Sequence, residues 1–555
     1  MVGGFFYFMA VGLIFKLHNL FQFMPKSYLF FLPVFLTLTI SVYGQIDDEL
    51  KNEIRIRTEQ LRGAGLFVGG EKICCGQSIS NVYSDRIFSP IWTDSLANQL
   101  LRQIENSELE GLFPEDYHYS LLKDLLQEKD LNVFEKANLD LLLTDSFLLY
   151  TTHLLSGKVN PVSLNPDWRV VKREGDPVEL LLKAISSNNV GESIAEARPK
   201  YKTYDRLRSK LARYKEIRDA GGWGEIEVGP TIKPGESGQR VLQVRKRLEA
   251  SGDLVGYTND EPEIFDEELK RAVLKYQRRY GLEEDGAVGK STLASMNVPV
   301  ELRIEDIILN LERCRWLPRE LGDHYIIVNL PAYEMELVKD GEIKLEMGVA
   351  VGKPYRQTPV FSSKMTYFVV NPYWTVPPTI LYQDMIPAQI KNPNYLSSLQ
   401  IKVLDESGNE VDPASVTWQT GVKFPYTLRQ EPGKMNALGR VKFIFPNEFN
   451  IYMHDTNHPE VFAKYNRALS SGCVRLSDPM KLAYYVGATQ NKPLSVSDID
   501  EISKSKSNQT IIMNSPIMVH LQYWTAFVDE NGFLNFRPDI YDRNSKLKKA
   551  LFSSL

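Results

Sequence analysis

The segment "SSGCVRLSDP", residues 470–479, holds the one cysteine of this chain whose neighbours favour chemistry. Cys473 follows Gly472, and Arg475 stands two residues later. The thiolate is the attacking form of cysteine, and a thiol with an ordinary pKa of about 8.5 needs a base or a positive environment near neutral pH. A glycine lets a substrate approach the backbone N–H groups that stabilise an oxyanion. The pattern predicts nucleophilic attack on a carbonyl, with Arg475 binding a substrate carboxylate.

The segment "NIYMHDTNHPEVF" supplies two candidates for the base. His454 follows an alternating, strand-like stretch, whereas His458 precedes Pro459 in a turn, so His454 is the predicted base. Tyr452 lies two residues before His454, and on a strand both side chains point to the same face. The sequence leaves open whether Asp455 or a backbone carbonyl orients the imidazole.

Other interpretations of these residues stay open at this point. Cys473 could be a buried structural cysteine, or half of a disulfide with Cys314. The two histidines, spaced i and i+4, could bind zinc, although the proline that follows and the strand-like stretch before them disfavour a helical zinc motif. The arginine could form a plain surface ion pair. The remaining cysteines, Cys74 and Cys75, are adjacent, and four cysteines in 555 residues make no disulfide framework.

Length and composition bound the class of protein. A chain of 555 residues predicts three or four domains, and 43% hydrophobic with 24% charged residues is ordinary for globular protein. The formal net charge is −5 and the pI is near 6.0. No strong basic field exists, so nucleic acid is not an expected partner.

The first residues predict export from the cytoplasm. In "MPKSYLFFLPVFLTLTISVYGQ", Lys26 supplies a positive start, residues 28–40 form an apolar run, and Gly44 ends it with a small residue. Residues 1–44 are therefore interpreted as a signal peptide whose true start is Met24, and an uncleaved anchor in the inner membrane is the alternative. Both predict a protein of the periplasm or cell envelope.

Periodicity divides the rest of the chain. Helical apolar spacing over 47–230 predicts a scaffold, and no catalytic cluster falls there. The Pro- and Gly-rich "EVGPTIKPGESG" is a linker, after which three short helices are expected. Strand-like alternation then dominates, with Asp340-Gly341 as a hairpin turn. The predicted fold is multidomain α+β, with a three-helix module at 233–298, a mainly-β catalytic domain at 302–535, an inserted flap at 377–432 and a C-terminal tail at 536–555.

The three-helix segment resembles a known binding module. The stretch "F…AVLKYQRRYGLEEDGAVGKSTL" is similar to the recurring pattern of the peptidoglycan-binding module, although a generic helical spacer would share its periodicity. Peptidoglycan is therefore the partner that this resemblance implies.

The residues around the cysteine resemble the active-site signature of the L,D-transpeptidases. "IYMHDT" followed by "NRALSSGCVRLSDP" matches that signature, except that Ser471 stands where the family usually has histidine before the glycine. This departure is typical of the large periplasmic branch, in which a helical scaffold and a peptidoglycan-binding module precede a catalytic domain with an inserted capping subdomain. "NPYWTVPPTI", "NALGRVKFIFPN" and "YWTAFVDENGFLNFRPDIY" are similar to the same branch.

The resemblance implies a mechanism. Cys473 would attack the bond between the diamino acid and the terminal D-alanine of a tetrapeptide stem, and an amine of a neighbouring stem would resolve the thioester to a 3→3 crosslink. His454 would serve as the base, and carbapenems would acylate the same sulfur. The implied oxyanion donors are the N–H groups of Gly472 and Cys473 and the hydroxyl of Tyr452. The implied substrate-binding residues are Arg475, Ser471, Trp374 and Asn436. No metal or organic cofactor is implied.

Two rival functions are weighed against transfer. A cysteine carboxypeptidase or endopeptidase would hydrolyse wall peptides, but papain-like wall peptidases place the cysteine before the histidine, and here His454 comes first. A non-catalytic wall-binding protein would not need His454, Gly472 and Cys473 together.

Overall fold

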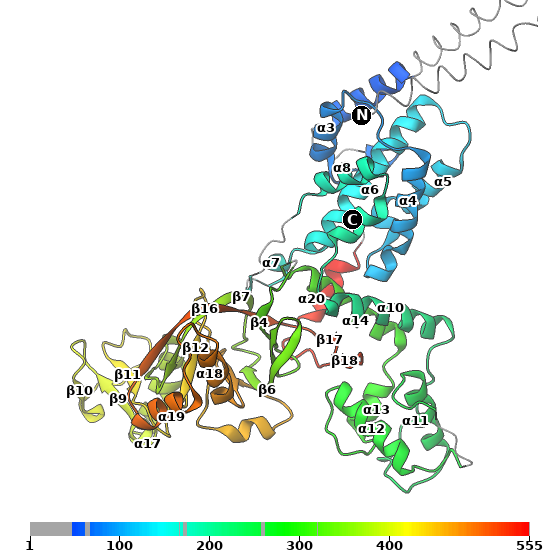
Figure 1. The fold of residues 1–555 in the computed structure, drawn as a ribbon. Coiled ribbons are helices and arrows are strands. Elements are labelled where there is room, and N and C mark those ends of the chain that lie inside the picture. The colour runs from blue at the N-terminus through cyan, green and yellow to red at the C-terminus, as the bar shows by residue number, and fades with distance from the viewer. Residues whose placement is uncertain are drawn as a thin grey trace, which may run out of the picture. The chain divides into compact units, whose positions relative to one another are not determined.

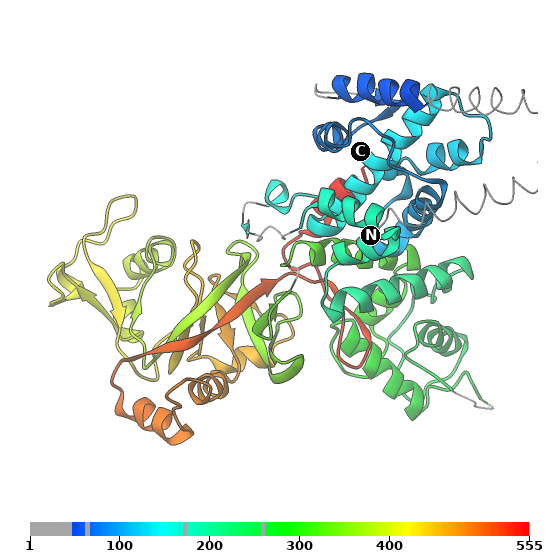
Figure 2. The same cartoon turned by 45° about the horizontal axis from the view of Figure 1, so that its top comes forward.

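The computed structural model describes residues 47–61, 67–165, 167–169, 175–256, 261–318 and 320–553 (Figures 1 and 2). The predicted leader over residues 1–44 lies outside these ranges. The chain divides into two compact units. The first contains the described residues up to Glu105 together with Pro114–Thr151 and Asp176–Glu196, and the second contains Asn106–Phe113, Thr152–Gly175 and the chain from Ala197. No helix within the described ranges is long and apolar enough to cross a membrane.

The first unit is helical, as the apolar spacing predicts. Its central helix, α6, carries two buried carboxylates that fix loops to it. Asp140 accepts hydrogen bonds from the N–H groups of Ile91 at 3.1 Å and Trp92 at 3.0 Å, and Asp145 accepts from that of Cys75 at 2.7 Å. Burial raises the pKa of Asp140 to about 6. Besides the helical residues 47–60, the helices that lie wholly or mostly in this unit are α3 (Gly76–Asp85), α4 (Asp94–Glu105), α5 (Tyr119–Gln127), α6 (Val133–Ser156), α8 (Pro177–Ser187) and α9 (Val190–Ala197).

The three-helix module lies in the second unit and packs as its periodicity predicts. Its helices are α11 (Gln239–Ala250), α12 (Glu267–Arg279) and α13 (Lys290–Met296). The carboxylate of Asp266 caps α12 by accepting the N–H of Leu269 at 2.8 Å. The side chains of the two expected apolar faces are buried: Val241, Val244, Leu248, Leu269, Val273 and Tyr276.

A large sheet forms the core of the remaining part of this unit. Its strands follow the order β12-β13-β15-β6-β5-β4-β16-β7-β3, with β14 paired beside β6. Because β12 also pairs with β7, the sheet closes on itself. The strands are β3 (Trp168–Arg169), β4 (His324–Asn329), β5 (Glu334–Lys339), β6 (Glu342–Gly352), β7 (Val360–Val370), β12 (Val441–Ile444), β13 (Met453–His454), β14 (Ala468–Ser470), β15 (Val474–Leu476) and β16 (Gln509–Gln522). The predicted α+β class with a mainly-β catalytic region is confirmed.

The hairpin predicted at Asp340-Gly341 is present. Strands β5 and β6 pair antiparallel on either side of it, and both turn residues have positive φ, 53° at Asp340 and 77° at Gly341. Aspartate and glycine tolerate this conformation, which suits the twist of a two-residue hairpin.

The insertion forms a folded flap with its own sheet, in the order β10-β9-β11-β8, and its own apolar core. Figure 1 shows β9, β10 and β11 as a group beside the main sheet. The flap is larger than the predicted 377–432, because β8 pairs with β11 and Leu438 joins the core. Among the apolar residues of the flap, Ile386 and Leu396 are buried, but Ile390 is exposed. The elements are β8 (Trp374–Thr375), α15 (Pro378–Ile380), the π-helix η4 (Leu381–Met385), α16 (Ile386–Lys391), α17 (Tyr395–Ser398), β9 (Ile401–Leu404), β10 (Glu410–Val411) and β11 (Thr427–Gln430).

The C-terminal residues are an integral part of the second unit and not a tail. A hairpin leads into α20, whose Leu547 and Leu551 are completely buried in the main core. Helix α20 packs against α14, which precedes the sheet in the chain. The other elements of this unit are α10 (Lys202–Asp219), α14 (Val300–Arg315), α18 (Pro479–Ala488), α19 (Val496–Ser505), β17 (Ala526–Val528), β18 (Leu534–Phe536) and α20 (Asn544–Leu551).

Candidate active site

Parallel pairing of β13 with β15 brings the predicted nucleophile and base together. The register places His454 opposite Arg475, and the N–H of Val474 donates to the carbonyl of Tyr452 at 3.1 Å. Cys473, which immediately precedes β15, therefore lies beside Tyr452. The pairing of these two short strands thus brings the segments that carry Cys473 and His454 side by side.

The sulfur of Cys473 sits in a partly buried position against the main core. Burial raises the pKa of its thiol to about 11, and the backbone N–H and hydroxyl of Tyr452 and the charge of Arg475 act in the opposite direction. Burial and the neighbouring sulfur in turn raise the pKa of the Tyr452 hydroxyl above its ordinary value. The resting thiol is protonated at neutral pH, so attack requires a base.

His454 is buried and has the form that a base needs. Its Nδ1 hydrogen-bonds the backbone carbonyl of Asp455, which assigns the proton to Nδ1 and leaves Nε2 free to accept one. Burial, followed by the charge of Arg475, lowers the pKa of the imidazole to about 3. The ring is therefore neutral across the physiological range.

The backbone carbonyl of Asp455, and not its carboxylate, orients the imidazole. The carboxylate accepts from the N–H of Arg440 at 2.9 Å, from the Nε of the same arginine at 3.1 Å and from the N–H of Thr456 at 2.8 Å. Gly439 makes room for it, since a Cβ there would lie 2.4 Å from the Asp455 Cγ. These bonds fix the peptide whose carbonyl holds His454.

Gly472 is required by the backbone of residues 471–473, which join β14 to β15, carry the candidate nucleophile and are called the catalytic loop here. Its φ of +118° lies in the region that favours glycine, and its carbonyl accepts from the hydroxyl of Thr358 at 2.7 Å. Its N–H donates to the Ser470 Oγ at 3.1 Å. Within the described residues the N–H of Cys473 donates to no acceptor, so of the two expected backbone oxyanion donors it is the one left available.

Arg475 offers an unsatisfied donor beside the sulfur. Its Nε is buried and makes no hydrogen bond within the described residues, and burial lowers the pKa of its guanidinium. A buried donor without a partner is costly, and a ligand carboxylate would satisfy it.

Arg356, which the sequence did not single out, ties the catalytic loop to the flap. Its Nη1 donates to Asp384 at 2.5 Å and to the Ser471 Oγ at 3.1 Å, and its Nη2 donates to Asp384 at 2.8 Å and to Gln383 at 2.9 Å. Asp384 lies on η4 of the flap. In the sequence Arg356 is only a basic residue in the turn "GKPYRQTP", and no local signal distinguishes it from a surface charge.

The other predicted residues lie in different surroundings. Trp374 packs in the core of the flap. The amide of Asn436 donates to the carbonyls of Pro372 at 2.9 Å and Glu431 at 3.0 Å. A role for Trp374 or Asn436 in substrate binding stays a prediction. His458 is exposed and pairs with Glu460 at 3.0 Å, away from the strand that carries His454.

The structure bears on two of the alternative interpretations, the disulfide and the metal site. All four cysteines are free thiols, and Cys314 is buried on α14, so the disulfide with Cys473 is not formed. The described ranges hold no cluster of three or more His, Cys, Asp or Glu side chains arranged for a metal ion.

A closed, mainly-β sheet with an inserted flap, and a partly buried cysteine and a buried histidine on neighbouring segments of that sheet, characterise the second unit. Residues 323–496 match the L,D-transpeptidase catalytic domain, residues 237–296 the "Putative peptidoglycan binding domain", and residues 77–211 the Scaffold domain. The resemblance found in the sequence is thereby confirmed: the chain carries the catalytic domain of the L,D-transpeptidase family, preceded by a scaffold and a peptidoglycan-binding domain.

Individual proteins resemble the chain as well. The "Putative L,D-transpeptidase" of Haemophilus influenzae is 26% identical over 489 residues, which cover 87% of this chain and 81% of the relative. Among solved structures, an L,D-transpeptidase from Mycobacterium smegmatis is 12% identical over 36% of this chain and 58% of its own, with a TM-score of 0.18. That from Stackebrandtia nassauensis is 14% identical over 53% of this chain and 97% of its own, with a TM-score of 0.20. Scores this low carry no weight for the fold.

Proposed function

We propose that the protein is a peptidoglycan L,D-transpeptidase that uses Cys473 as its nucleophile. The observation that carries the proposal is the pairing of β13 with β15, which puts a protonated, partly buried thiol at the start of one strand and a neutral, backbone-oriented imidazole on the other. The match to the L,D-transpeptidase catalytic domain supports transfer as the reaction class, and the matched peptidoglycan-binding domain supports the wall as the substrate.

In the first half-reaction His454 Nε2 takes the thiol proton as the sulfur attacks the carbonyl carbon between the diamino acid and D-alanine. The S–C bond forms, and the oxyanion is met by the N–H of Cys473 and the hydroxyl of Tyr452, which the raised pKa keeps protonated as a donor. The C–N bond then breaks, and the imidazolium gives its proton to the leaving amine of D-alanine. A thioester remains on Cys473.

In the second half-reaction an amine of another stem attacks the thioester. His454 takes a proton from this amine, the new C–N bond forms, and the sulfur leaves and regains the proton. The product is a 3→3 crosslink with the free thiol restored. Arg475 binds a carboxylate of the donor stem through the donor that the protein leaves unpaired.

The flap is proposed to cover the donor stem during this second step. Its tie to the catalytic loop, through Arg356 and Asp384, supports this role. A flap that covers the thioester would exclude water, and this would favour an amine over water as the acceptor. This reaction takes place on the wall, which places the protein in the periplasm or cell envelope.

The experiment that tests the proposal is intact-protein mass spectrometry after incubation with disaccharide-tetrapeptide. We expect loss of D-alanine and one acyl adduct that maps to Cys473, and acylation of the same residue by a carbapenem. Crosslinked dimers should appear among the products. An adduct that persists in Cys473→Ala would contradict the assignment.

A further inference from the structure

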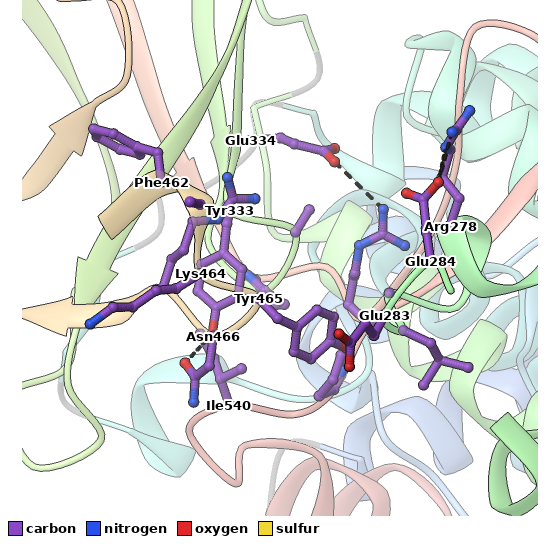
Figure 3. A pocket seen from close by; sticks show the side chains of 18 residues that line it. Arg278, Glu283, Glu284, Tyr333, Glu334, Phe462, Lys464, Tyr465, Asn466 and Ile540 are labelled. Carbon is purple, nitrogen blue, oxygen red and sulfur yellow. Dashed lines mark hydrogen bonds and ion pairs between the residues drawn. The ribbon is translucent and has the colours of Figure 1, made fainter. Parts of the chain in front are cut away.

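A cavity whose lining contains neither Cys473 nor His454 lies in the second unit (Figure 3). It has a volume of about 650 Å³, which is within the range of small-ligand sites. One wall comes from residues 278–284, where the peptidoglycan-binding module ends α12. The facing segments are residues 331–334 between β4 and β5, residues 462–467 before β14, and residues 537–540.

Arg467 lines this cavity and has a hydrogen-bond donor without a partner within the described residues. Its Nε is buried and has no hydrogen-bond partner within the described residues, and its guanidinium lies 5.4 Å from the ring centre of Tyr333. Gly348 on β6 leaves it space, because a Cβ there would stand 2.8 Å from the Arg467 Nη1. A half-buried guanidinium that is positioned but not hydrogen-bonded is suited to a carboxylate, which can fill two of its donors at once.

The other charges of the lining are largely paired. Arg278 contacts Glu284 at 2.7 Å and Arg537 contacts Glu334 at 3.5 Å, as the dashed lines of Figure 3 show. Glu283, from the module wall, makes no hydrogen bond or ion pair within the described part of the chain. The cavity therefore presents the Arg467 guanidinium, whose pKa burial lowers and the charge of Glu334 raises, and the exposed Glu283 carboxylate, which makes no ion pair within the described residues.

An exposed aromatic ring completes the lining. Tyr465 is 52% exposed, and the hydroxyl of the neighbouring Tyr333 is fixed by a 3.0 Å hydrogen bond to the Asn466 Oδ1. An apolar ring face beside separated opposite charges fits a short peptide that bears both a carboxylate and an amine better than a neutral sugar.

We propose that this cavity binds a peptidoglycan stem peptide that is not the one reacting at Cys473, with a peptide carboxylate on Arg467 and a peptide amine on Glu283. The proposal rests on the proposed function for its choice of the wall as the source of the peptide. The lining segment 462–467 runs through β14 directly into the catalytic loop, so an occupied cavity would hold the wall next to the reacting centre.

The test measures binding of a synthetic tetrapeptide stem to the full chain carrying Cys473→Ala, by isothermal titration calorimetry. We expect a binding event that Arg467→Gln weakens at least about tenfold, since a charge-assisted, two-point hydrogen bond is lost. Arg213→Gln is the matched control, because Arg213 is an exposed arginine of α10 in the same unit, paired with Glu216. It should leave binding unchanged.

A second variant guards against misfolding of the first. Ala463 is exposed and lines the cavity, so Ala463→Trp should block it without removing a buried charge. The donor site at Cys473 can also bind the tetrapeptide, so the informative quantity is the difference between each variant and the Cys473→Ala parent. If neither Arg467→Gln nor Ala463→Trp removes or weakens any binding event of the parent, the proposal is overturned. A cavity-dependent event produced by the peptide-free disaccharide and not by the tetrapeptide would overturn it as well.

The outcome is separable from that of the proposed function. Thioester formation at Cys473 is measured on the wild-type chain by mass spectrometry. If the thioester forms but no binding event depends on Arg467, only the cavity proposal fails. If Arg467-dependent binding occurs without a thioester, the transferase mechanism fails and the cavity proposal stands.

Discussion

The thiol of Cys473 has a pKa of about 11 because burial disfavours its thiolate. Alkylation needs the thiolate, so at pH 8 its fraction should be roughly two orders of magnitude below that of an ordinary thiol with a pKa of about 8.5. We predict that the rate of iodoacetamide alkylation at Cys473 keeps rising between pH 8 and pH 10. Peptide mapping by mass spectrometry measures it, with glutathione as the reference thiol.

The same experiment separates two resting states. A rate that is half-maximal near pH 8.5 and levels off by about pH 10 would show an ordinary thiol, and fast alkylation already at pH 6 would show a preformed thiolate–imidazolium pair. Either result would contradict a neutral Cys473 beside a neutral His454, whose pKa of about 3 keeps it uncharged above about pH 4.

Replacing His454 should remove the base without unfolding the site. We predict that His454→Ala lowers turnover by about 10²–10⁴-fold, the usual contribution of a positioned general base. His458→Ala is the matched control, because His458 is exposed and pairs only with Glu460 among the described residues. Turnover is followed by release of D-alanine, and a larger loss in His458→Ala would reverse the assignment.

At this scale the sequence predicts the chemistry of side chains but not all of their partners. Residue type and strand alternation predict Cys473 and His454 as the nucleophile and the base, because both signals are local. Arg356 and the carbonyl of Asp455 could not be identified, because the first acts across a loop and the second through its backbone.

Among the elements, the ion pair of Arg356 with Asp384 is one of the contacts that link the flap to the catalytic loop. Asp384 on η4 receives both terminal nitrogens of Arg356, while Arg356 also holds Ser471. We predict that Asp384→Ala loosens the flap but leaves the catalytic residues in place. Crosslinking should then fall and the share of thioester lost to water should rise, while acylation by a small β-lactam persists.

Product analysis by mass spectrometry measures this partition. Glu410→Ala is the matched control, because Glu410 is also a flap carboxylate and pairs with Lys402 inside the flap at 2.9 Å. An unchanged ratio of crosslinked to hydrolysed product in Asp384→Ala would show that the ion pair does not control closure.

The hairpin turn could be predicted from the sequence, but the extent of the flap could not. The turn at Asp340-Gly341 was predictable because its two residues alone satisfy the backbone requirement. The full extent of the flap was not, because β8 has two residues and is defined only by its pairing with β11, which lies more than fifty residues later. A strand this short carries no detectable alternation.

For the molecule as a whole, the sequence predicts the order of parts but assigns the C-terminus wrongly. The segment 536–555 is expected from the sequence to be a C-terminal tail. In the structure its few apolar side chains complete the core of the second unit, where Leu547 is fully buried against the elements that also carry the sheet. The burial of Leu547 depends on packing against residues that are distant in the sequence, so the apolar pattern of a short helix does not predict it.

Removing one of these side chains should therefore weaken the catalytic unit from outside the matched catalytic domain. We predict that Leu547→Ala lowers the free energy of opening of the second unit by about 2–5 kcal/mol, the usual cost of a large-to-small change in a core. Native-state hydrogen exchange of β16 amides in the full chain measures it, because a chain of several domains does not unfold in two states. Lys549→Ala, an exposed change on the same helix, should alter exchange little. Equal effects of the two substitutions would mean that α20 is a detachable appendage rather than part of the core that supports the site.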